Sequence, residues 1–384
     1  MRSPAVVLLL GVSLLAACRP ADVRAPVADA IVPELSPRDD LWRIHFIDVG
    51  QGLAVLHEFP CGAVLVDTGG ELDERFDSVA ALQAYLDAFF ARRTDLHGTL
   101  DLLALTHPHL DHTRGVALVL ARYAVRNAID DGLTVGSGAE GQLALQRWAQ
   151  QHAGTVGYRA VLRDDVVDPA GLTDAIIDPV RCDGVDPRIA ALWGQVSQDP
   201  GWPGVRYGKT PFQNGNNHSV VLRFSYGRAS MLHTGDLEEP AIRDLLARSG
   251  PTGALDVDVY QVGHHGSING TLPELVAAMT PELAVFSCGP PDWQVMWSAW
   301  KFGHPRQEIV AMLQAGIVRR RRPIEVLVGV RSETFTTQRI DAALYASAWD
   351  GTVVVEAESD GRMRVLTAGR RWPGGRVHGA PASL

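Results

Sequence analysis

The chain has 384 residues, of which 46% are hydrophobic and 21% are charged. Its 35 Lys and Arg residues against 44 Asp and Glu residues give a net charge of -9, which excludes a protein that binds nucleic acid through a global positive field. A polyanionic substrate would have to be held by bound cations or by a local basic patch.

The first residues have the pattern of an export signal. Arg2 supplies a short positive region, residues 5–15 form an apolar run, and Leu-Ala-Ala-Cys ending at Cys18 matches the bacterial lipobox. We therefore expect residues 1–17 to be a lipoprotein signal peptide and Cys18 to carry a lipid anchor. Arg19 at the next position favours the outer membrane or the cell surface. The alternatives are an ordinary signal peptide or a short membrane helix, although the apolar run is too short to span a bilayer.

A single folded domain is expected after this signal. Residues 18–40 are rich in Pro, Ala and charge without an apolar period, which is typical of a flexible tether. Residues 41–367 form the domain, and the Arg-rich and Gly-rich residues 368–384 are expected to be a loose tail. The three further cysteines are Cys61, Cys182 and Cys288. Outside the cytoplasm two of them could pair, but their odd number fixes no connectivity.

Strand and helix signals alternate along the domain. Residues 42–48 and 63–67 are rich in β-branched and aromatic side chains and end on glycines, which predicts strands. Residues 74–93 have apolar side chains at helical spacing, and residues 102–106 form an apolar run typical of a buried strand. The same signals predict helices over 113–125, 142–152, 238–248 and 272–279, and strands over 257–262, 283–287 and 352–356.

Three further stretches complete the domain. Residues 219–226 and 229–234 form a hairpin pattern around a turn at Gly227. Residues 154–217 are expected to be a long irregular excursion, and residues 319–344 an insertion before the closing strand. This order of elements favours an α/β fold with two sheets sandwiched between helices.

The strongest chemical signal is His107-Pro108-His109-Leu110-Asp111-His112, which follows the buried strand at 102–106. Neutral imidazoles and carboxylates are the ligands of zinc, manganese or iron in hydrolytic sites. Alternate residues of an extended loop point the same way, so His107 and His109 can share one metal ion. Asp111 and His112 can then serve a second one.

Three later segments supply further ligand types where strands begin or end. Asp236 follows a predicted strand and is a candidate bridging carboxylate. One of the adjacent His264 and His265 would complete the second metal site. His264 is favoured because it directly follows another strand, and the other histidine would orient the substrate or contact solvent. His218 opens the hairpin and is a candidate to complete the first site, with a strand-end histidine of no metal role as the alternative.

These motifs resemble those of the metallo-β-lactamase superfamily, and within it the extracellular hydrolase domains of ComEC-like DNA-uptake proteins. The supporting strings, in family order, are Phe46 to Gly52, Val66 to Gly70, Thr106 to His112, Asn217 to Val221, Thr234 to Asp236, Val262 to Ser267 and Gly303 to Pro305. The resemblance implies a four-layer αββα metallo-β-lactamase sandwich that binds two divalent metal ions, Zn or Mn.

The sequence departs from the family at two places. Leu53 stands where the family usually has Asp, and the stretch 319–344 has no family counterpart before the closing strand. We expect metal binding to survive both changes, whereas contacts with the substrate are expected to have shifted.

Other residues have candidate roles outside the metal ligands. Asp67 is expected to hold a metal-ligating imidazole or the motif loop in place, with a turn-forming Asp as the alternative. Asp111 and His265 are candidate catalytic residues. His304 matches a family histidine and is a candidate general acid or donor to a phosphate. The run Arg319 to Arg322 is expected to be a solvated face rather than a phosphate site.

The favoured function is a hydrolase whose metal-bound hydroxide attacks a phosphodiester, either DNA or a small extracellular ester. One alternative is hydrolysis of β-lactams, lactones or thioesters, although Asn-His-Ser-Val-Val from Asn217 replaces the Gly-His-Thr-Pro-Gly-like motif of those relatives. The other is a tethered binding protein with a vestigial metal site. The expected partners are the phosphodiester substrate and a membrane, and the sequence identifies no protein partner.

Overall fold

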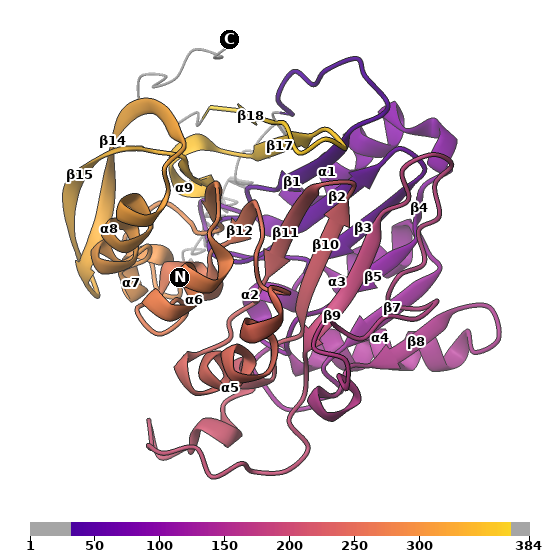
Figure 1. Ribbon diagram of the computed structural model, residues 1–384, viewed down its shortest axis with the longest axis horizontal. Coiled ribbons are helices and arrows are strands. Elements are labelled where there is room, and N and C mark those ends of the chain that lie inside the picture. The colour runs from indigo at the N-terminus through magenta and orange to yellow at the C-terminus, as the bar shows by residue number, and fades with distance from the viewer. Residues whose placement is uncertain (1–31, 370–384) are drawn as a thin grey trace, which may run out of the picture.

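Two sheets lie face to face between layers of helices in the computed structural model, which describes residues 32–369 (Figure 1). This arrangement confirms the predicted αββα sandwich. The predicted signal peptide (1–17), the lipidation site Cys18 and most of the predicted tail lie outside the described residues. Within 32–369 no helix is both long and apolar enough to cross a membrane.

The first sheet has eight strands in the order β18-β17-β1-β2-β3-β5-β7-β8. Their bounds are β1 (Trp42–Phe46), β2 (Val55–Phe59), β3 (Gly62–Val66), β5 (Leu102–Ala104), β7 (Asn127–Asp130), β8 (Gly157–Ala160), β17 (Val353–Ala357) and β18 (Met363–Thr367). Both faces of this sheet are covered, because in β3 Val64 and Val66 enter the core between the sheets while Ala63 and Leu65 pack with the outer helices.

The second sheet has six strands in the order β16-β13-β12-β11-β10-β9. They are β9 (Arg188–Trp193), β10 (Val221–Tyr226), β11 (Ala229–His233), β12 (Val259–Gln261), β13 (Leu283–Phe286) and β16 (Leu344–Ala346). The predicted hairpin is confirmed, since β10 and β11 pair antiparallel. From β11 to β16 the strands are parallel, so the loops that follow them meet at one edge.

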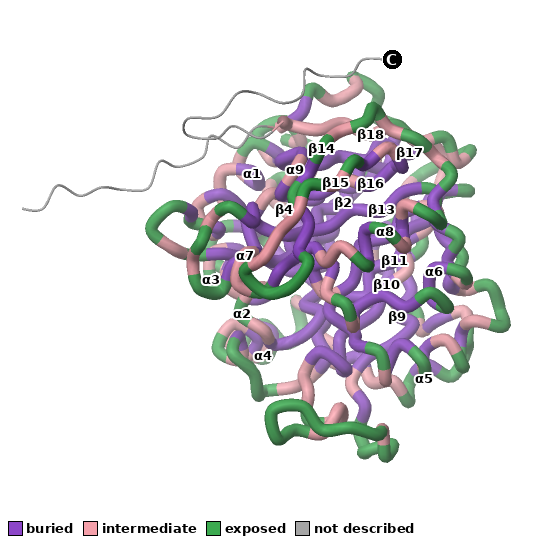
Figure 2. The backbone as a smooth tube through the Cα atoms, turned by 90° about the vertical axis from the view of Figure 1, so that its left-hand side faces the viewer, coloured by how far each residue is buried: buried purple, intermediate pink, exposed green. Residues whose placement is uncertain are grey.

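Helices line the outer faces, and the strands between them are buried (Figure 2). The helices α1 (Ser78–Arg92), α3 (Val116–Arg122) and α4 (Ala139–Gln151) pack on the first sheet, and α5 (Glu239–Ser249), α6 (Pro273–Met279) and α8 (Gln307–Gly316) belong to the other core. Helix α1 begins four residues later than predicted, because the Asp77 side chain accepts hydrogen bonds from the amides of Val79 and Ala80 and caps the helix there.

The prediction of one continuous helix over 113–125 is wrong. It is divided into α2 (Leu110–Thr113) and α3, and residues 124–125 form the short strand β6 (Ala124–Val125), which pairs with β4 (Thr99–Leu100). The break occurs at Gly115, where a Cβ atom would lie 2.7 Å from the carbonyl oxygen of Thr68. Glycine therefore lets this turn approach the loop that follows β3.

The stretch 154–217 is less irregular than predicted. It contributes β8 to the edge of the first sheet and β9 to the edge of the second. A disulfide between Cys61 and Cys182 ties the β2–β3 turn to this stretch, and Cys288 is buried. Of the pairings that the sequence left open, the structure contains this one.

The insertion at 319–344 forms a long hairpin of β14 (Arg320–Arg331) and β15 (Thr334–Ala342), beside α8 and α7 (Ala299–Phe302) (Figure 1). A further short helix, α9 (Ser347–Asp350), precedes β17.

In the predicted tether, residues 32–40 lie against the domain. The Ser36 amide donates to the Glu356 side chain, and the Ser36 carbonyl accepts from Arg43.

Candidate metal centre

Strand ends bring the predicted ligands together. Strand β5 leads into the His107 to His112 motif, β11 into Asp236, and β12 into His264 and His265. The motif loop belongs to the first sheet and the other two segments to the second. The site therefore lies at the junction of the two sheets.

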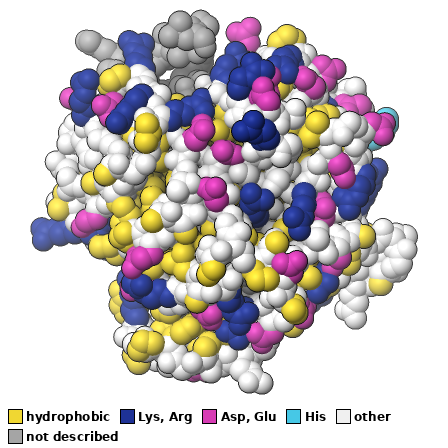
Figure 3. All heavy atoms as spheres, in the orientation of Figure 1, with side chains coloured by type: hydrophobic (Ala, Val, Ile, Leu, Met, Phe, Trp, Pro, Cys, Tyr) yellow, Lys and Arg dark blue, Asp and Glu magenta, His cyan; other side chains and the backbone are white. Residues whose placement is uncertain are grey.

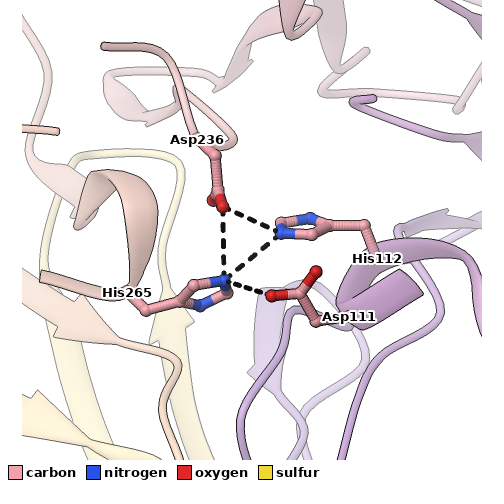
Figure 4. Close-up of side chains that lie close together, drawn as sticks. All are labelled: Asp111, His112, Asp236 and His265. Atoms are coloured by element: carbon pink, nitrogen blue, oxygen red, sulfur yellow. Dashed lines mark hydrogen bonds and ion pairs between the residues drawn. The ribbon is translucent and has the colours of Figure 1, made fainter. Parts of the chain in front are cut away.

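Four side chains form a compact cluster, Asp111, His112, Asp236 and His265, whose ligand atoms all lie within 4.8 Å of one another (Figure 4). The Nε2 atoms of His112 and His265 lie 3.3 Å and 3.4 Å from Asp236 Oδ2. His265 Nε2 also lies 3.3 Å from Asp111 Oδ2. Two carboxylates and two imidazoles at this spacing could hold one divalent cation.

Hydrogen bonds at the far side of each imidazole fix its orientation. His112 Nδ1 donates to Asp67 Oδ2 over 2.7 Å, and His265 Nδ1 donates to the carbonyl oxygen of Ser287 over 2.7 Å. Each ring therefore turns Nε2 toward the cluster, as metal-binding histidines do when a carboxylate or carbonyl holds the other nitrogen.

Asp67 lies behind the cluster, in the position expected of a supporting carboxylate. It is fully buried with a positive φ of 56°, and it accepts hydrogen bonds from the amide and hydroxyl of Thr106 at Oδ1 and Oδ2. These contacts link the loop after β3 to the start of the histidine motif. Asp67 thus couples the motif loop to the orientation of His112.

The charges of the cluster balance one another in the protein without a cation. Burial opposes a charge on His265, but the neighbouring Asp236 and Asp111 raise its pKa to about 10. Burial likewise opposes ionisation of Asp236, but His265 and His112 hold the pKa of that carboxyl well below its usual range. A cation that binds here must displace protons from the imidazoles, so cation binding is coupled to pH.

A second group of ligands surrounds the same carboxylate less tightly. His107 Nε2 and His264 Nε2 lie 3.9 Å and 3.8 Å from Asp236 Oδ2. His107 Nε2 and Asp236 Oδ1 are buried without a hydrogen-bond partner. Buried polar atoms are normally satisfied, so an additional cation is a fitting partner for these two atoms. His109 packs edge-on against His107, with ring centroids 4.6 Å apart.

His264 and His265 lie on different sides of Asp236. His265 belongs to the compact cluster, whereas His264 lies on the other side of Asp236 with Nδ1 3.7 Å from Glu238 Oε1. Both histidines have left-handed backbone angles, with φ of 49° and 54°. Proximity to the strand end favoured His264, but two consecutive left-handed residues turn His265 toward Asp111 and His112 instead.

The ring nitrogens of His218, the candidate to complete the first metal site, contact the backbone. Its Nδ1 accepts a hydrogen bond from the Val196 amide over 3.0 Å, and its Nε2 donates to the Phe212 carbonyl over 2.7 Å. Both ring nitrogens are therefore occupied by the backbone of the 154–217 stretch. His218 holds that stretch in place and is not free to bind a metal ion in this arrangement.

His304 lies beside the cluster, with its ring stacked on that of His265 at a centroid distance of 6.2 Å. Gln51 Oε1 accepts from the Gly289 amide, which leaves its Nε2 to donate to His304 Nδ1 over 3.3 Å. Burial holds the pKa of His304 well below its usual value. With Nδ1 accepting from Gln51, the Nε2–H group of His304 is a candidate hydrogen-bond donor to a substrate.

Two supporting residues were missed by the sequence reasoning. Gln51 lies within the motif Phe46 to Gly52. The sequence therefore shows that it belongs to a family motif, but its contact with His304 is seen only in the structure. Glu238 follows Asp236 by two residues, and its Oε1 accepts a hydrogen bond from Asn216 Nδ2 over 2.8 Å. Only the folded chain brings Glu238 next to His264.

Comparison with known proteins agrees with the fold. The two-sheet sandwich with histidines and aspartates at its strand ends defines a metal-binding protein of the metallo-hydrolase class. The family model described as the metallo-beta-lactamase superfamily matches residues 47–289, well over half of the chain. The chain belongs to the metallo-β-lactamase superfamily.

Its relatives include ComEC-like competence proteins. ComE operon protein 3 of Bacillus subtilis is 26% identical over 286 residues, which cover 72% of this chain and 31% of that protein. Recombination protein 2 of Haemophilus influenzae is 28% identical over 269 residues, which cover 68% of this chain and 25% of that protein. The chain thus spans a third or less of the length of these relatives.

Among solved structures, the metallo-beta-lactamase fold protein YhfI from Bacillus subtilis matches 64% of this chain and 85% of its own. The identity is 12% and the TM-score is 0.37.

Proposed function

We propose that this protein is a metal-dependent phosphodiesterase that acts outside the cytoplasm. The observation that supports it best is the compact cluster of Asp111, His112, Asp236 and His265. Two divalent cations, Zn or Mn, would supply an activated water molecule and would offset charge on a phosphoryl group. The second cation would be held by His107, His109 and His264 on the other side of Asp236.

The residues around the cluster have distinct tasks in this proposal. Asp236 lies between both ligand groups and would hold the two cations at a fixed separation. Asp67 and the Ser287 carbonyl keep His112 and His265 in the required tautomer. His304 would donate its Nε2 proton in a hydrogen bond to a phosphoryl oxygen of the substrate, and Gln51 would fix the tautomer that makes this possible.

A phosphodiester is favoured over a β-lactam by the relatives and by the string Asn-His-Ser-Val-Val from Asn217, which replaces the Gly-His-Thr-Pro-Gly-like motif of β-lactam, lactone and thioester hydrolases. The name of Recombination protein 2 points to a process that acts on DNA. The net charge of -9 is compatible with an anionic substrate because the cations would supply the positive field. A small extracellular phosphodiester would suit the same arrangement.

The location outside the cytoplasm is part of the proposal. The lipobox at Cys18 would place the protein on a membrane facing the cell exterior or the periplasm. The disulfide between Cys61 and Cys182 supports this location, because disulfides persist in oxidising compartments.

The test is an assay of the chain without residues 1–17, loaded with Zn or Mn. The substrates are bis-p-nitrophenyl phosphate, single-stranded DNA, double-stranded DNA and a chromogenic β-lactam. We expect turnover of phosphodiesters in the wild type, and losses of more than about 100-fold in His109→Ala and Asp236→Asn, because each removes a direct ligand.

Three results would contradict the proposal. Turnover of the β-lactam alone would assign the protein to the other hydrolase class. Equal turnover in the wild type and both variants would show that the chemistry occurs elsewhere. Well under one metal ion per purified chain would favour a binding protein with a vestigial site.

A further inference from the structure

Four stacked or neighbouring rings run outward from the metal cluster to the solvent. The ring of His265 stacks on that of His304, and His304 stacks on Phe302 with centroids 5.6 Å apart and planes at 27°. Phe302 contacts Trp297, with centroids 6.2 Å apart. Exposure rises along this series from 2% for His265 and 6% for His304 to 37% for Phe302 and 75% for Trp297.

The inserted hairpin supports the segment that carries these rings. The Gly329 amide donates to the carbonyl of Pro305 over 2.8 Å, and the Glu333 amide donates to that of Trp300 over 2.9 Å. The fit is close, since a Cβ atom on Gly329 would lie 2.1 Å from the Gly303 carbonyl oxygen. The stretch 319–344, which departs from the family pattern, thus holds residues 300–305, and with them Phe302, at a fixed place beside the cluster.

Packing accounts for the Phe302 ring only in part and for most of the Trp297 ring not at all. Trp297 leaves three quarters of its surface in water, and a segment held only for stability would be expected to bury its aromatic side chains. The neighbouring Trp293 provides the contrast, because its ring packs against the buried Phe76 with centroids 5.5 Å apart. Trp297 and Phe302 instead offer their rings to a ligand that reaches the cluster.

The charges nearby favour stacking over electrostatic attraction as the means of recognition. Lys301 pairs with Glu333 and Arg306 pairs with Glu308, so the cations of this segment are neutralised. On the face drawn in Figure 3, Lys and Arg side chains are interspersed with Asp and Glu side chains. A ligand bound here is therefore recognised chiefly by its planar groups.

We propose that Trp297 and Phe302 form a stacking subsite for nucleobases of single-stranded nucleic acid, next to the phosphodiester held at the metal centre. This inference rests on the proposed phosphodiesterase function and names its substrate class. Bases of a single strand present free π-faces that stack on aromatic side chains, whereas those of a duplex are already stacked. The inserted hairpin is then a specificity element of this chain.

The test separates binding from turnover. Fluorescence anisotropy of a labelled oligothymidylate is measured on EDTA-treated protein without residues 1–17, for the wild type, Trp297→Ala and Phe302→Leu. We expect each substitution to weaken binding about 10-fold to 100-fold, because one stacking contact is lost. The matched control is Tyr207→Ala, which removes a 91% exposed aromatic side chain from a different segment and is expected to leave binding unchanged.

Turnover of metal-loaded protein provides a second measurement. The ratio of turnover on the oligonucleotide to turnover on glycerophosphoglycerol, which has neither a planar group nor a cation that binds aromatic rings, is expected to fall in Trp297→Ala by a similar factor. A merely structural role of Trp297 would lower both activities and leave this ratio unchanged, and that result would overturn the proposal.

The outcomes distinguish this inference from the proposed function. If no phosphodiester is cleaved but oligothymidylate binding depends on Trp297, the phosphodiesterase function fails and the subsite stands. If phosphodiesters are cleaved while Trp297→Ala and Phe302→Leu bind the single strand as tightly as the wild type, the subsite fails. Tighter binding of a duplex than of the single strand, or an equal loss in Tyr207→Ala, would also overturn it.

Discussion

The two halves of the candidate metal centre differ in how much of their geometry the protein determines by itself. Around Asp111, His112 and His265, hydrogen bonds from Asp67 and Ser287 hold the imidazoles in place, and the ligand atoms lie within 4.8 Å of one another. On the other side of Asp236, Thr106 Oγ1 contacts His107 Nδ1 over 3.1 Å, but His264 Nδ1 has no hydrogen-bond partner, and the Nε2 atoms of His107 and His264 lie 3.9 Å and 3.8 Å from Asp236 Oδ2.

From this difference we expect that the two cations of the proposed function would bind with different affinities. A site whose ligands are already oriented loses less conformational freedom when the cation binds, so it binds more tightly. We therefore expect the compact half to fill first. The looser half is expected to fill at higher metal concentration, with some rearrangement of His264 and Glu238.

The largest effect on metal affinity is expected from His265→Ala, compared with His264→Ala. His265→Ala removes a ligand from the compact half and should weaken the tighter site by more than about 100-fold, since even outer hydrogen-bond partners are worth up to that factor. His264→Ala should abolish binding of the second, more weakly bound metal ion only. Metal content by plasma emission spectrometry and metal titration by calorimetry would check both, and equal losses in the two variants would contradict the distinction.

A smaller effect is expected from Asp67→Asn, which keeps the shape of the side chain and tolerates the positive φ of this position. The variant loses the charged acceptor for His112 Nδ1, so affinity in the compact half should fall by about 10-fold to 100-fold. Calorimetric titration would measure the change. The looser half should keep its affinity, and a loss confined to that half would refute the role assigned to Asp67.

The smallest effect on metal binding is expected from His218→Ala. Because His218 bonds the backbone of Val196 and Phe212, its loss leaves two polar groups without partners and should lower the free energy of unfolding by about 1–3 kcal/mol. Metal content should stay at the wild-type value. Thermal unfolding and metal analysis of the same sample would test this, and loss of one metal equivalent would restore His218 as a ligand.

The sequence predicted the fold class and most of the elements around the site, because apolar periodicity and glycine-bounded strands are local signals. Strand β2 was missed, since His57 and Glu58 interrupt its apolar pattern. Both side chains are nevertheless buried, because His57 hydrogen-bonds His233 and Glu58 pairs with Arg92. Such partners lie far away in sequence, so no local pattern reveals that a polar residue is buried.

The residue types of the candidate site could be predicted from the sequence, but the orientations of their side chains could not. The string His107 to His112 and the strand-end position of Asp236 followed from motif and spacing. The direction of His218 depends on the backbone of Val196 and Phe212, and that of His265 depends on two left-handed residues. Neither is encoded in the spacing of histidines along the chain.

The left-handed conformation of His264 and His265 has a consequence for how this centre trades stability against function. A non-glycine residue in this region costs about 1–2 kcal/mol relative to the right-handed helical conformation, and two such residues stand side by side. Glycine would relieve the strain at either position but would remove an imidazole. His264→Gly is therefore expected to unfold at a higher temperature than His264→Ala although both lack the same ligand. The chain sacrifices part of its fold stability to present two adjacent imidazoles on opposite sides of one carboxylate.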